Sequence, residues 1–320
     1  IILSSTIRMY SGDKTKKKAR PQLTLLKVIV FVLLLGFIFW QLYKQNWGQM
    51  QVFRLKNPLY LFISLLLIVA NQGCEWFKWL HIAKHLTADR QSIRNAFFAG
   101  ISAGFLSPNG WGNFIGRMVF FRRRDQMFII LSSFISNVSQ VLPTIFFGAL
   151  ACFYSEKAGT ELSLLSLIAG ILILIGFFFG EYLLPKRKTA NRMIRHFNLL
   201  QKRLGSLRLP LFLWSHLRFL IFSLQYALLF MAFGYTDLWY LLTQVWLIFL
   251  LTSFIPSLWS GKVIIRETAA LFVFSGSAVA VPDIILVSLL IWIFNIVFPA
   301  FVSSFVWFPV LKKQKTHVVD

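Results

Sequence analysis

Long apolar runs alternate with short polar segments along the whole chain. About 20 apolar residues in an α-helix cross a hydrocarbon layer roughly 30 Å thick. Runs of this kind predict membrane-spanning helices over residues 23–43, 59–80, 127–154, 162–184, 211–235 and 284–311. Two more stretches, 97–121 and 238–281, are apolar but carry Pro and Gly inside them. The pattern predicts an all-α integral membrane protein, a polytopic helical bundle of about seven to eight spans.

The two interrupted stretches share a local sequence pattern. One reads PNGWGNFIGR over residues 108–117, and the other reads PSLWSGKVIIRE over residues 256–267. A helix broken at membrane depth exposes backbone groups that lipid cannot satisfy, so such breaks persist only against protein or a wet cavity. Paired interruptions in the two halves of a transporter also point to its substrate site. We expect two re-entrant-like segments, broken at Pro108, Gly112, Gly116, Pro256 and Gly261.

Basic residues gather in three polar segments, although the chain is 57% hydrophobic and carries a formal net charge of +22. These segments are an N-terminal tail (1–22), a central loop (185–210) and a C-terminal tail (312–320), with one transmembrane domain over 23–311. Under the positive-inside rule all three are cytoplasmic, so both termini lie inside. Anionic lipid of the inner leaflet accounts for such clusters, and no nucleic acid partner is expected.

This orientation brings the two broken segments into the membrane from opposite sides. The first is approached from the cytoplasm, and the basic residues at 122–124 return it there. The second lies between Asp237 and Asp283, both of which are predicted to be outside. Opposite approach of two similar segments predicts halves of inverted topology. The basic residues within 44–56 fall on the outer side in this scheme, against the rule.

The central loop 185–210 contains a basic amphipathic pattern. Apolar residues recur at helical spacing, and a glycine suited to a C-terminal cap follows them: Met193, Phe197, Leu200, Leu204 and Gly205. The pattern predicts a separate helix that lies on the inner leaflet. The alternative is a docking site for a cytoplasmic or membrane enzyme.

Arg117 and Arg266 are the first candidates for binding a ligand. The guanidinium group is always charged and holds phosphate through a planar fork of donors. Lys262 lies one turn before Arg266, and Glu267 lies beside it, so the second segment is strongly ionic. Helix N-termini after the breaks would add N–H groups aimed at an anion. The alternative is that each arginine reaches an interface or forms a structural pair.

Glu75 and Arg218 are the next candidates. Glu75 belongs to a polar stripe in the span 59–80, together with Asn71, Gln72 and Lys78. Glu75 either pairs with Lys78 or supplies a counter-charge to an arginine or a titratable proton site. Arg218 lies eight residues after the basic loop, so the favoured interpretation is that it snorkels to the interface.

No pattern predicts a cofactor, a metal site or a catalytic centre. Cys74 and Cys152 lie in apolar runs and support neither a disulfide framework nor a Cys-based metal site. His81 and His85 are too few for a metal site by themselves. The chain has no phosphate-binding loop motif and no loop long enough for a catalytic domain. We expect no cofactor and no autonomous enzyme; an intramembrane transferase is the least favoured reading.

The two broken segments carry a family resemblance. GFLSPN at 104–109, Gly112 and Gly116-Arg117, together with the stretch 256–266, resemble the transmembrane region of the lysylphosphatidylglycerol synthase family, which is described as flippase-like. The resemblance covers 23–311 and extends to the membrane half of bacterial multiple-peptide-resistance proteins. It implies handling of a lipid headgroup across the bacterial inner membrane. The aminoacyl-transferase domain of full-length synthases is absent from this sequence, so the resemblance implies no synthase activity.

Two positions depart from the family pattern. Relatives commonly carry an acidic residue where Asn113 stands, and the second motif often has an acidic residue and a Gly in place of Lys262 and Ile264. These exchanges make the site more cationic, so we expect either a substrate more anionic than a lysylated lipid or a loss of transport activity.

The expected function is translocation or binding of an anionic lipid headgroup, either a phospholipid or a polyprenyl-phosphate-linked lipid. The substrate-binding residues would be Arg117, Arg266, Arg218, Lys262 and Asn113, with Glu75 and Glu267 as counter-charges. The alternative is a non-transporting scaffold for a separate lipid-modifying or glycan-assembly enzyme.

Overall fold

A computed structural model describes Trp40, Tyr43 and residues 55–107, 112–154, 160–183, 192–254 and 261–306. Within these ranges every regular element is a helix. The predicted first span, both tails, Pro108 and Pro256 lie outside the described residues, apart from the two isolated positions in the first span. The prediction of an all-α protein is confirmed for the part of the chain that is described.

The helices follow the predicted apolar runs to within a few residues at most ends. They are α3 (Pro58–Ala83), α4 (Arg90–Leu106), α5 (Gly112–Met118), α6 (Arg123–Tyr154), α7 (Thr160–Leu183), α8 (Arg192–Ala232), α9 (Leu238–Phe254), α10 (Gly261–Val273) and α11 (Val281–Trp292), which continues through the π-helical turn η3 (Ile293–Val297). Asp89 caps α4 by accepting hydrogen bonds from the backbone N–H groups of Gln91 and Ser92, both 3.1 Å long. The hydrogen bonds to Ser92 lower the pKa of Asp89.

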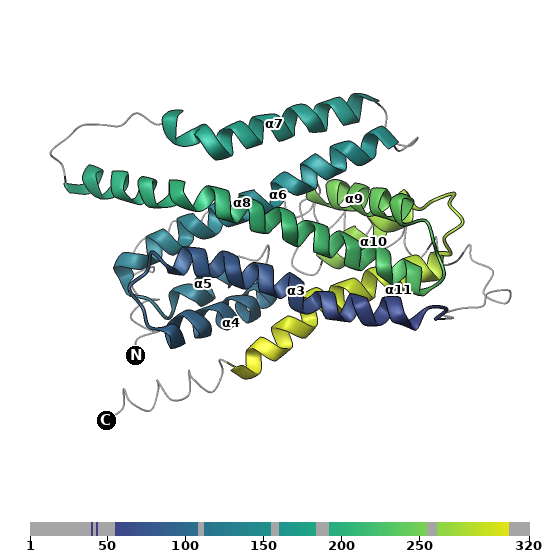
Figure 1. The fold of residues 1–320 in the computed structure, drawn as a ribbon, viewed down its shortest axis with the longest axis horizontal. Coiled ribbons are helices and arrows are strands. Elements are labelled where there is room, and N and C mark those ends of the chain that lie inside the picture. The colour runs from purple at the N-terminus through teal and green to yellow at the C-terminus, as the bar shows by residue number, and fades with distance from the viewer. Residues whose placement is uncertain are drawn as a thin grey trace.

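Four of these helices are long and apolar enough to cross a membrane. They are Pro58–Ala83, Arg123–Tyr154, Arg203–Ala232 and Val281–Val306. They run the length of the bundle in Figure 1, and α7 lies beside α6 at its edge. Helix α7 exposes many large apolar side chains, including Leu165, Ile168 and Leu172, as a lipid-facing helix does. A membrane protein with several spans is therefore supported.

The described parts of the two predicted broken segments belong to two pairs of packed helices, each of which we call a hairpin. Helices α4 and α5 pack against each other at one end of the bundle, and α9 and α10 pack against each other at the opposite end (Figure 1). Gly112 begins α5 and Gly261 begins α10, so both glycines lie where a helix restarts after an interruption.

Glycines allow α4 and α5 to approach closely. A Cβ atom on Gly116 would lie 2.5 Å from the carbonyl oxygen of Ala99 and 2.9 Å from the Cβ of Ala103. A Cβ on Gly112 would overlap the carbonyl of Ala103 even more closely. The prediction that Gly116 breaks a helix is wrong, because it lies inside α5 and provides space for the neighbouring backbone.

The prediction of a separate amphipathic helix ending at Gly205 is also wrong. Helix α8 runs without interruption through Gly205 and Pro210 to Ala232, a total of 41 residues. At 1.5 Å per residue it is about 60 Å long, roughly twice the thickness of a hydrocarbon layer. Packing of its second half within the bundle extends the helix past the glycine, which is only a weak helix breaker. Residues 185–191 of the predicted loop lie outside the described part.

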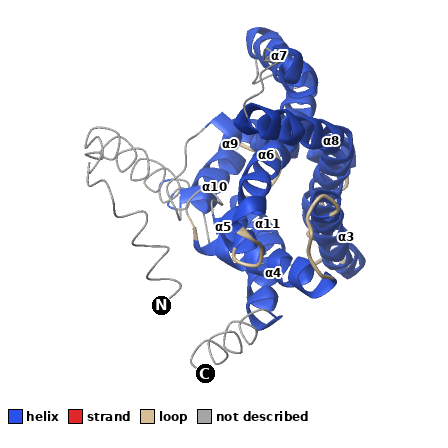
Figure 2. Ribbon diagram, turned by 90° about the vertical axis from the view of Figure 1, so that its left-hand side faces the viewer, coloured by secondary structure: helices blue, strands red, loops and turns tan. Residues whose placement is uncertain are grey.

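Two apolar clusters form the core, one toward each end of the bundle. The first includes Trp79, Phe97, Ile129 and Leu211, and the second joins α8, α9, α10 and α11 around residues such as Phe230. Helices α3 and α8 lie side by side, as the end view in Figure 2 shows. Along α8, the polar residues Ser215 and Arg218 fall between the segments that enter the two clusters. A polar region is therefore enclosed between two apolar ones.

Candidate functional site

Three basic side chains surround the carboxylate of Glu75. Arg218 Nη1 lies 2.8 Å from Glu75 Oε2, Arg117 Nη2 lies 3.3 Å from Oε1, and Lys78 Nζ lies 3.4 Å from Oε2. One negative charge offsets one of three positive charges, so this group carries a net charge of +2. We call these four residues the Glu75 cluster.

The helices bring the Glu75 cluster together from distant parts of the sequence. Asn71, Glu75 and Lys78 are four and three residues apart on α3, so they share one face of that helix. Arg117 lies in the last turn of α5, and Arg218 lies in the half of α8 that packs against α3. The close α4–α5 contact therefore helps to place Arg117 next to α3.

The members of the Glu75 cluster differ in their exposure. The side chains of Lys78 and Arg117 are 1% and 3% exposed, whereas that of Arg218 is 26% exposed. The Arg117 guanidinium also lies over the indole ring of Trp79, with its Cζ atom 4.6 Å from the ring centroid. A cation above an aromatic face is stabilised by the ring quadrupole. Arg117 and Lys78 therefore hold Glu75 from within the protein, and Arg218 is the cation open to a ligand.

Amide side chains connect the cluster to the middle of the bundle. Arg218 Nε donates to Asn71 Oδ1 at 2.9 Å, and Asn71 donates in turn to Asn295 Oδ1. Asn295 Nδ2 then donates to Gln225 Oε1 at 2.8 Å. Asn71, Gln225 and Asn295 are all buried, and each has a hydrogen-bond partner, as buried polar groups require.

The π-helical turn η3 places Asn295 in this network. Pro299 has no N–H group, so the carbonyl of Asn295 lacks its α-helical donor four residues later. Gln72 Nε2 donates to that carbonyl at 3.4 Å. Turns of this type within α-helices frequently occur at functional sites.

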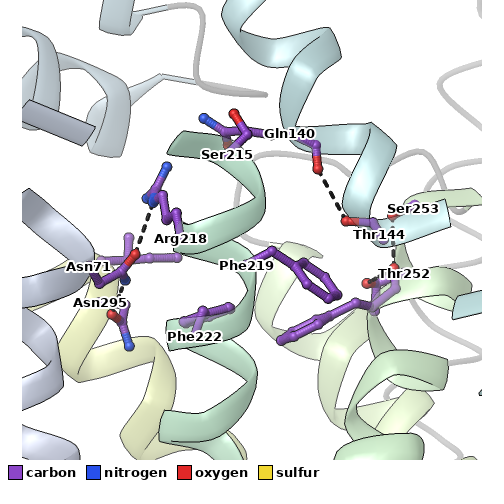
Figure 3. Close-up of a pocket in the computed structure, with 12 residues that line it drawn as sticks. Asn71, Gln140, Thr144, Ser215, Arg218, Phe219, Phe222, Thr252, Ser253 and Asn295 are labelled. Carbon is purple, nitrogen blue, oxygen red and sulfur yellow. Dashed lines mark hydrogen bonds between the residues drawn. The ribbon is translucent and has the colours of Figure 1, made fainter. Parts of the chain in front are cut away.

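A cavity of about 290 Å³ lies beside the cluster, lined by Asn71, Gln140, Thr144, Ser215, Arg218, Phe219, Phe222, Phe249, Thr252, Ser253, Asn295 and Ile296. Figure 3 shows Arg218 and Asn71 directed toward each other on one side of it, with Phe219 and Phe222 on the same helix as Arg218. The cavity combines a charged group, hydroxyls and amides with apolar walls, which is the composition of a ligand site.

Gln140 links the cavity to the cluster. With its amide oxygen toward the cations, that oxygen accepts from Lys78 Nζ at 2.5 Å and from Arg218 Nη1 at 3.2 Å. With the amide reversed, its nitrogen instead donates to Glu75 Oε2 at 3.4 Å. The first orientation gives hydrogen-bond acceptors to two cations, Lys78 and Arg218, whereas the second gives one donor to Glu75. It is favoured because cations are in excess here.

Arg266 and Glu267 belong to a second ionic group nearer the opposite end. Arg266 Nη2 donates to the backbone carbonyl of Ser288 at 3.1 Å, and the Ser288 hydroxyl is hydrogen-bonded to the Tyr226 hydroxyl. Both Arg266 and Glu267 are buried, with 8% and 6% exposure. Tyr226 lies eight residues after Arg218 on α8, which corresponds to about 12 Å along the helix axis.

The structure thus separates residues that the sequence analysis had grouped. Arg117 is hydrogen-bonded to Glu75 and Arg266 to the carbonyl of Ser288, so among the described residues the two arginines have no hydrogen-bond partner in common. The interpretation of Arg218 as snorkelling to an interface is wrong, because Glu75 and Asn71 attract its guanidinium into the interior. Glu75 pairs with Lys78 and with two arginines at once, so both of its predicted pairings are present.

The remaining candidates contribute less to the described geometry. The side chain of Lys262 is outside the described part, although its backbone lies in α10. Asn113 packs against Gly100 one turn before Arg117, and its Oδ1 atom is buried without a hydrogen-bond partner.

Sequence reasoning missed Asn295, Gln140 and Trp79. Asn295 is a single amide in an apolar run, Gln140 lies in the predicted span 127–154, and a buried polar group in such a run requires a partner. That requirement could have marked both amides as network residues. Trp79 follows Lys78 directly, and nothing in the sequence shows that it lies under Arg117.

Comparison with known proteins found no matching family model, no similar curated protein and no matching solved structure. Within the described residues, no three His, Cys, Asp or Glu side chains gather in a way that could hold a metal ion.

Proposed function

We propose that this protein binds an anionic lipid headgroup beside Arg218 and moves it between the leaflets of a bacterial inner membrane. The observation that supports this proposal is the net charge of +2 on the Glu75 cluster, next to a polar cavity. Buried cations are costly unless paired, and a phosphate group would offset the excess charge. The flippase-like resemblance of the two broken segments points to the same class of ligand.

The exposure of each cation suggests its role. Arg218 would donate to the phosphate oxygens, because it lines the cavity and keeps a quarter of its side chain accessible. Arg117 and Lys78 would keep Glu75 ionised and in place, and Glu75 would orient Arg218. Asn71 would hold the Arg218 guanidinium in place by accepting a hydrogen bond from its Nε atom.

The arrangement of the hairpins supports a route through the protein. In a membrane, the α4–α5 and α9–α10 hairpins would be re-entrant segments that enter from opposite leaflets, related as inverted halves. The Glu75 cluster would serve one leaflet and the Arg266 group the other, about 12 Å apart along α8. With an inside-negative potential, outward movement of one negative charge gains about 2.3 kcal/mol per 100 mV.

A leaflet-accessibility assay in liposomes tests the proposal. Purified wild type, Arg218→Gln and Arg124→Gln would be compared with fluorescent phosphatidylglycerol, its lysylated form and a short polyprenyl phosphate. Loss of one charged hydrogen bond is worth about 1.5–3 kcal/mol, so Arg218→Gln is expected to slow movement of the preferred lipid about 10-fold to 100-fold. Arg124 has a side chain that is 60% exposed and serves as the matched control.

Arg218→Gln should remain folded, because Glu75 keeps two cationic partners in that variant. Equal rates for Arg218→Gln and Arg124→Gln would contradict the site assignment. If wild type accelerates none of the three lipids, the transport proposal fails and the scaffold alternative is favoured.

A further inference from the structure

Glu267 is a buried carboxyl group without a hydrogen-bond donor. It is 6% exposed, and neither of its oxygens accepts a hydrogen bond from a described residue. The Ser288 hydroxyl, which is hydrogen-bonded to Tyr226, is near enough to interact with Glu267 but forms no hydrogen bond of ordinary geometry with it. A buried carboxylate in this position would bear a large desolvation cost.

Helix geometry explains why the neighbouring arginine does not pair with Glu267. Consecutive residues on an α-helix point about 100° apart, so Arg266 and Glu267 face different neighbours. Accordingly no ion pair within 4.0 Å joins them, and Arg266 Nε is also buried without a partner. On its own face, Glu267 is followed by the buried apolar residues Ala270 and Leu271.

The helices packed against α10 supply no other charge to Glu267. Among the described residues, the ionisable groups that interact electrostatically with Glu267 are Tyr226 on α8 and Arg266. On α11 the ionisable residue is Asp283, which accepts a hydrogen bond from Tyr235 at 2.9 Å at the helix end. On α9 it is Tyr240, in the first turn. Among the described side chains around Glu267, Arg266 thus carries the one fixed positive charge.

Glu75 provides a contrast within the same molecule. Both carboxyl groups are buried at similar exposure, 7% for Glu75 and 6% for Glu267. Glu75 has three cations within 3.4 Å, whereas Glu267 has no donor at all among the described residues. The first environment favours the ionised form, and the second favours the protonated form.

We propose that Glu267 is a proton-binding site, and that it binds its proton more tightly when an anion is bound at Arg266 than when the anion is absent. An ionised Glu267 competes with an external anion for the positive charge of Arg266. Protonation removes that competition and leaves the orphaned Arg266 Nε–H as a donor for the anion. By linkage, each binding event favours the other to the same degree.

The coupling to an anion rests on the proposed function, whereas proton binding by Glu267 does not. If one proton accompanies a singly charged headgroup, their joint movement carries no net charge. Transport would then respond to a pH gradient and not to the membrane potential.

Infrared spectroscopy of the purified full chain in liposomes tests proton binding directly. The carbonyl stretching band of a protonated carboxyl should be present at pH 7 in wild type and in Glu161→Gln, which changes an exposed glutamate, and absent in Glu267→Gln. Loss of the band in Glu161→Gln, or its retention in Glu267→Gln, would overturn the assignment.

A second measurement needs no variant and so does not depend on the folding of one. Dicyclohexylcarbodiimide adds to protonated carboxyl groups: the acid proton moves to a carbodiimide nitrogen and the carboxyl oxygen bonds the central carbon, without a leaving group. Peptide mass spectrometry of labelled wild type should find the adduct on Glu267 and not on Glu75. An adduct on Glu75 at equal or higher yield would contradict the proposal.

The coupling is tested by adding a short polyprenyl phosphate above the pH at which half of the infrared band is lost. The band should grow in wild type and stay constant in Arg266→Gln. A constant band in wild type would refute the coupling and leave the proton site and the transport proposal standing.

Discussion

Replacing Glu75 with glutamine is expected to destabilise the protein more than any other single polar substitution in the bundle. The change would leave Lys78, Arg117 and Arg218 facing one another without a counter-charge, in a region where two of them are almost fully buried. Removing one partner of a buried ion pair costs about 3–5 kcal/mol. The loss should appear as a lower unfolding temperature of the detergent-solubilised protein.

A charge-balance variant and a surface control sharpen this test. The double variant Glu75→Gln, Lys78→Met removes one cation with the anion and should recover part of the lost stability. Glu161→Gln changes an exposed glutamate near the start of α7 and should leave the unfolding temperature unchanged. Equal unfolding temperatures for Glu75→Gln and Glu161→Gln would show that the cluster does not stabilise the fold.

Replacing Gly116 with alanine is expected to separate the α4–α5 hairpin. The new Cβ would meet the backbone carbonyl of Ala99 at 2.5 Å, and a backbone cannot turn aside as a flexible side chain can. Overpacking of this kind costs about 1–3 kcal/mol. Because Arg117 is the next residue, displacement of α5 would also pull its guanidinium away from Glu75. We expect both a lower unfolding temperature and a loss of lipid movement in liposomes.

Gly176→Ala is the matched control. Gly176 lies inside α7, and a Cβ there would meet no atom within 4 Å. Alanine is favoured over glycine in a helix by up to about 1 kcal/mol, so this variant should be as stable as wild type or slightly more stable. If Gly116→Ala behaved in the same way, the close contact between α4 and α5 would have no energetic importance.

The positions of the helices could be predicted from the sequence, because lipid and core both select apolar runs of helical length. The 59–80 and 127–154 runs became α3 and α6, and one helix ends before each predicted interruption and another begins after it. The end of the amphipathic helix could not be predicted at Gly205. Whether a helix continues past a glycine depends on what packs against it further along, and that is a tertiary property.

The site could be predicted only in part. Glu75, Arg117, Arg218 and Arg266 could be identified because they are charged residues in apolar runs. Such residues are costly to bury and usually have a partner or a function. Their grouping could not be inferred: similar local motifs suggested one shared site for Arg117 and Arg266, whereas the fold puts them in different hairpins. Tertiary packing determines which cation faces the cavity, so the spacing of residues in the sequence could not identify it.

The π-helical turn η3 also shifts the phase of the last helix. Before the turn, the buried side follows Ile284, Ser288 and Ile291, at a spacing close to the α-helical period. An uninterrupted α-helix would then bury positions near 298 and 302. Instead the buried residues are Pro299, Ala300 and Ser303, and Phe298 and Val302 are exposed.

One extra residue in the turn thus delays the pattern by one position and rotates everything after it by about 100°. The delay brings small residues toward α4, where Ser102 donates to the carbonyl of Ala300 at 3.3 Å. It also turns Phe301 and Phe305 outward, at 61% and 67% exposure. The pattern of buried and exposed positions in this helix therefore has one phase before η3 and another, shifted by one residue, after it. Asn295 lies in the turn where the phase changes.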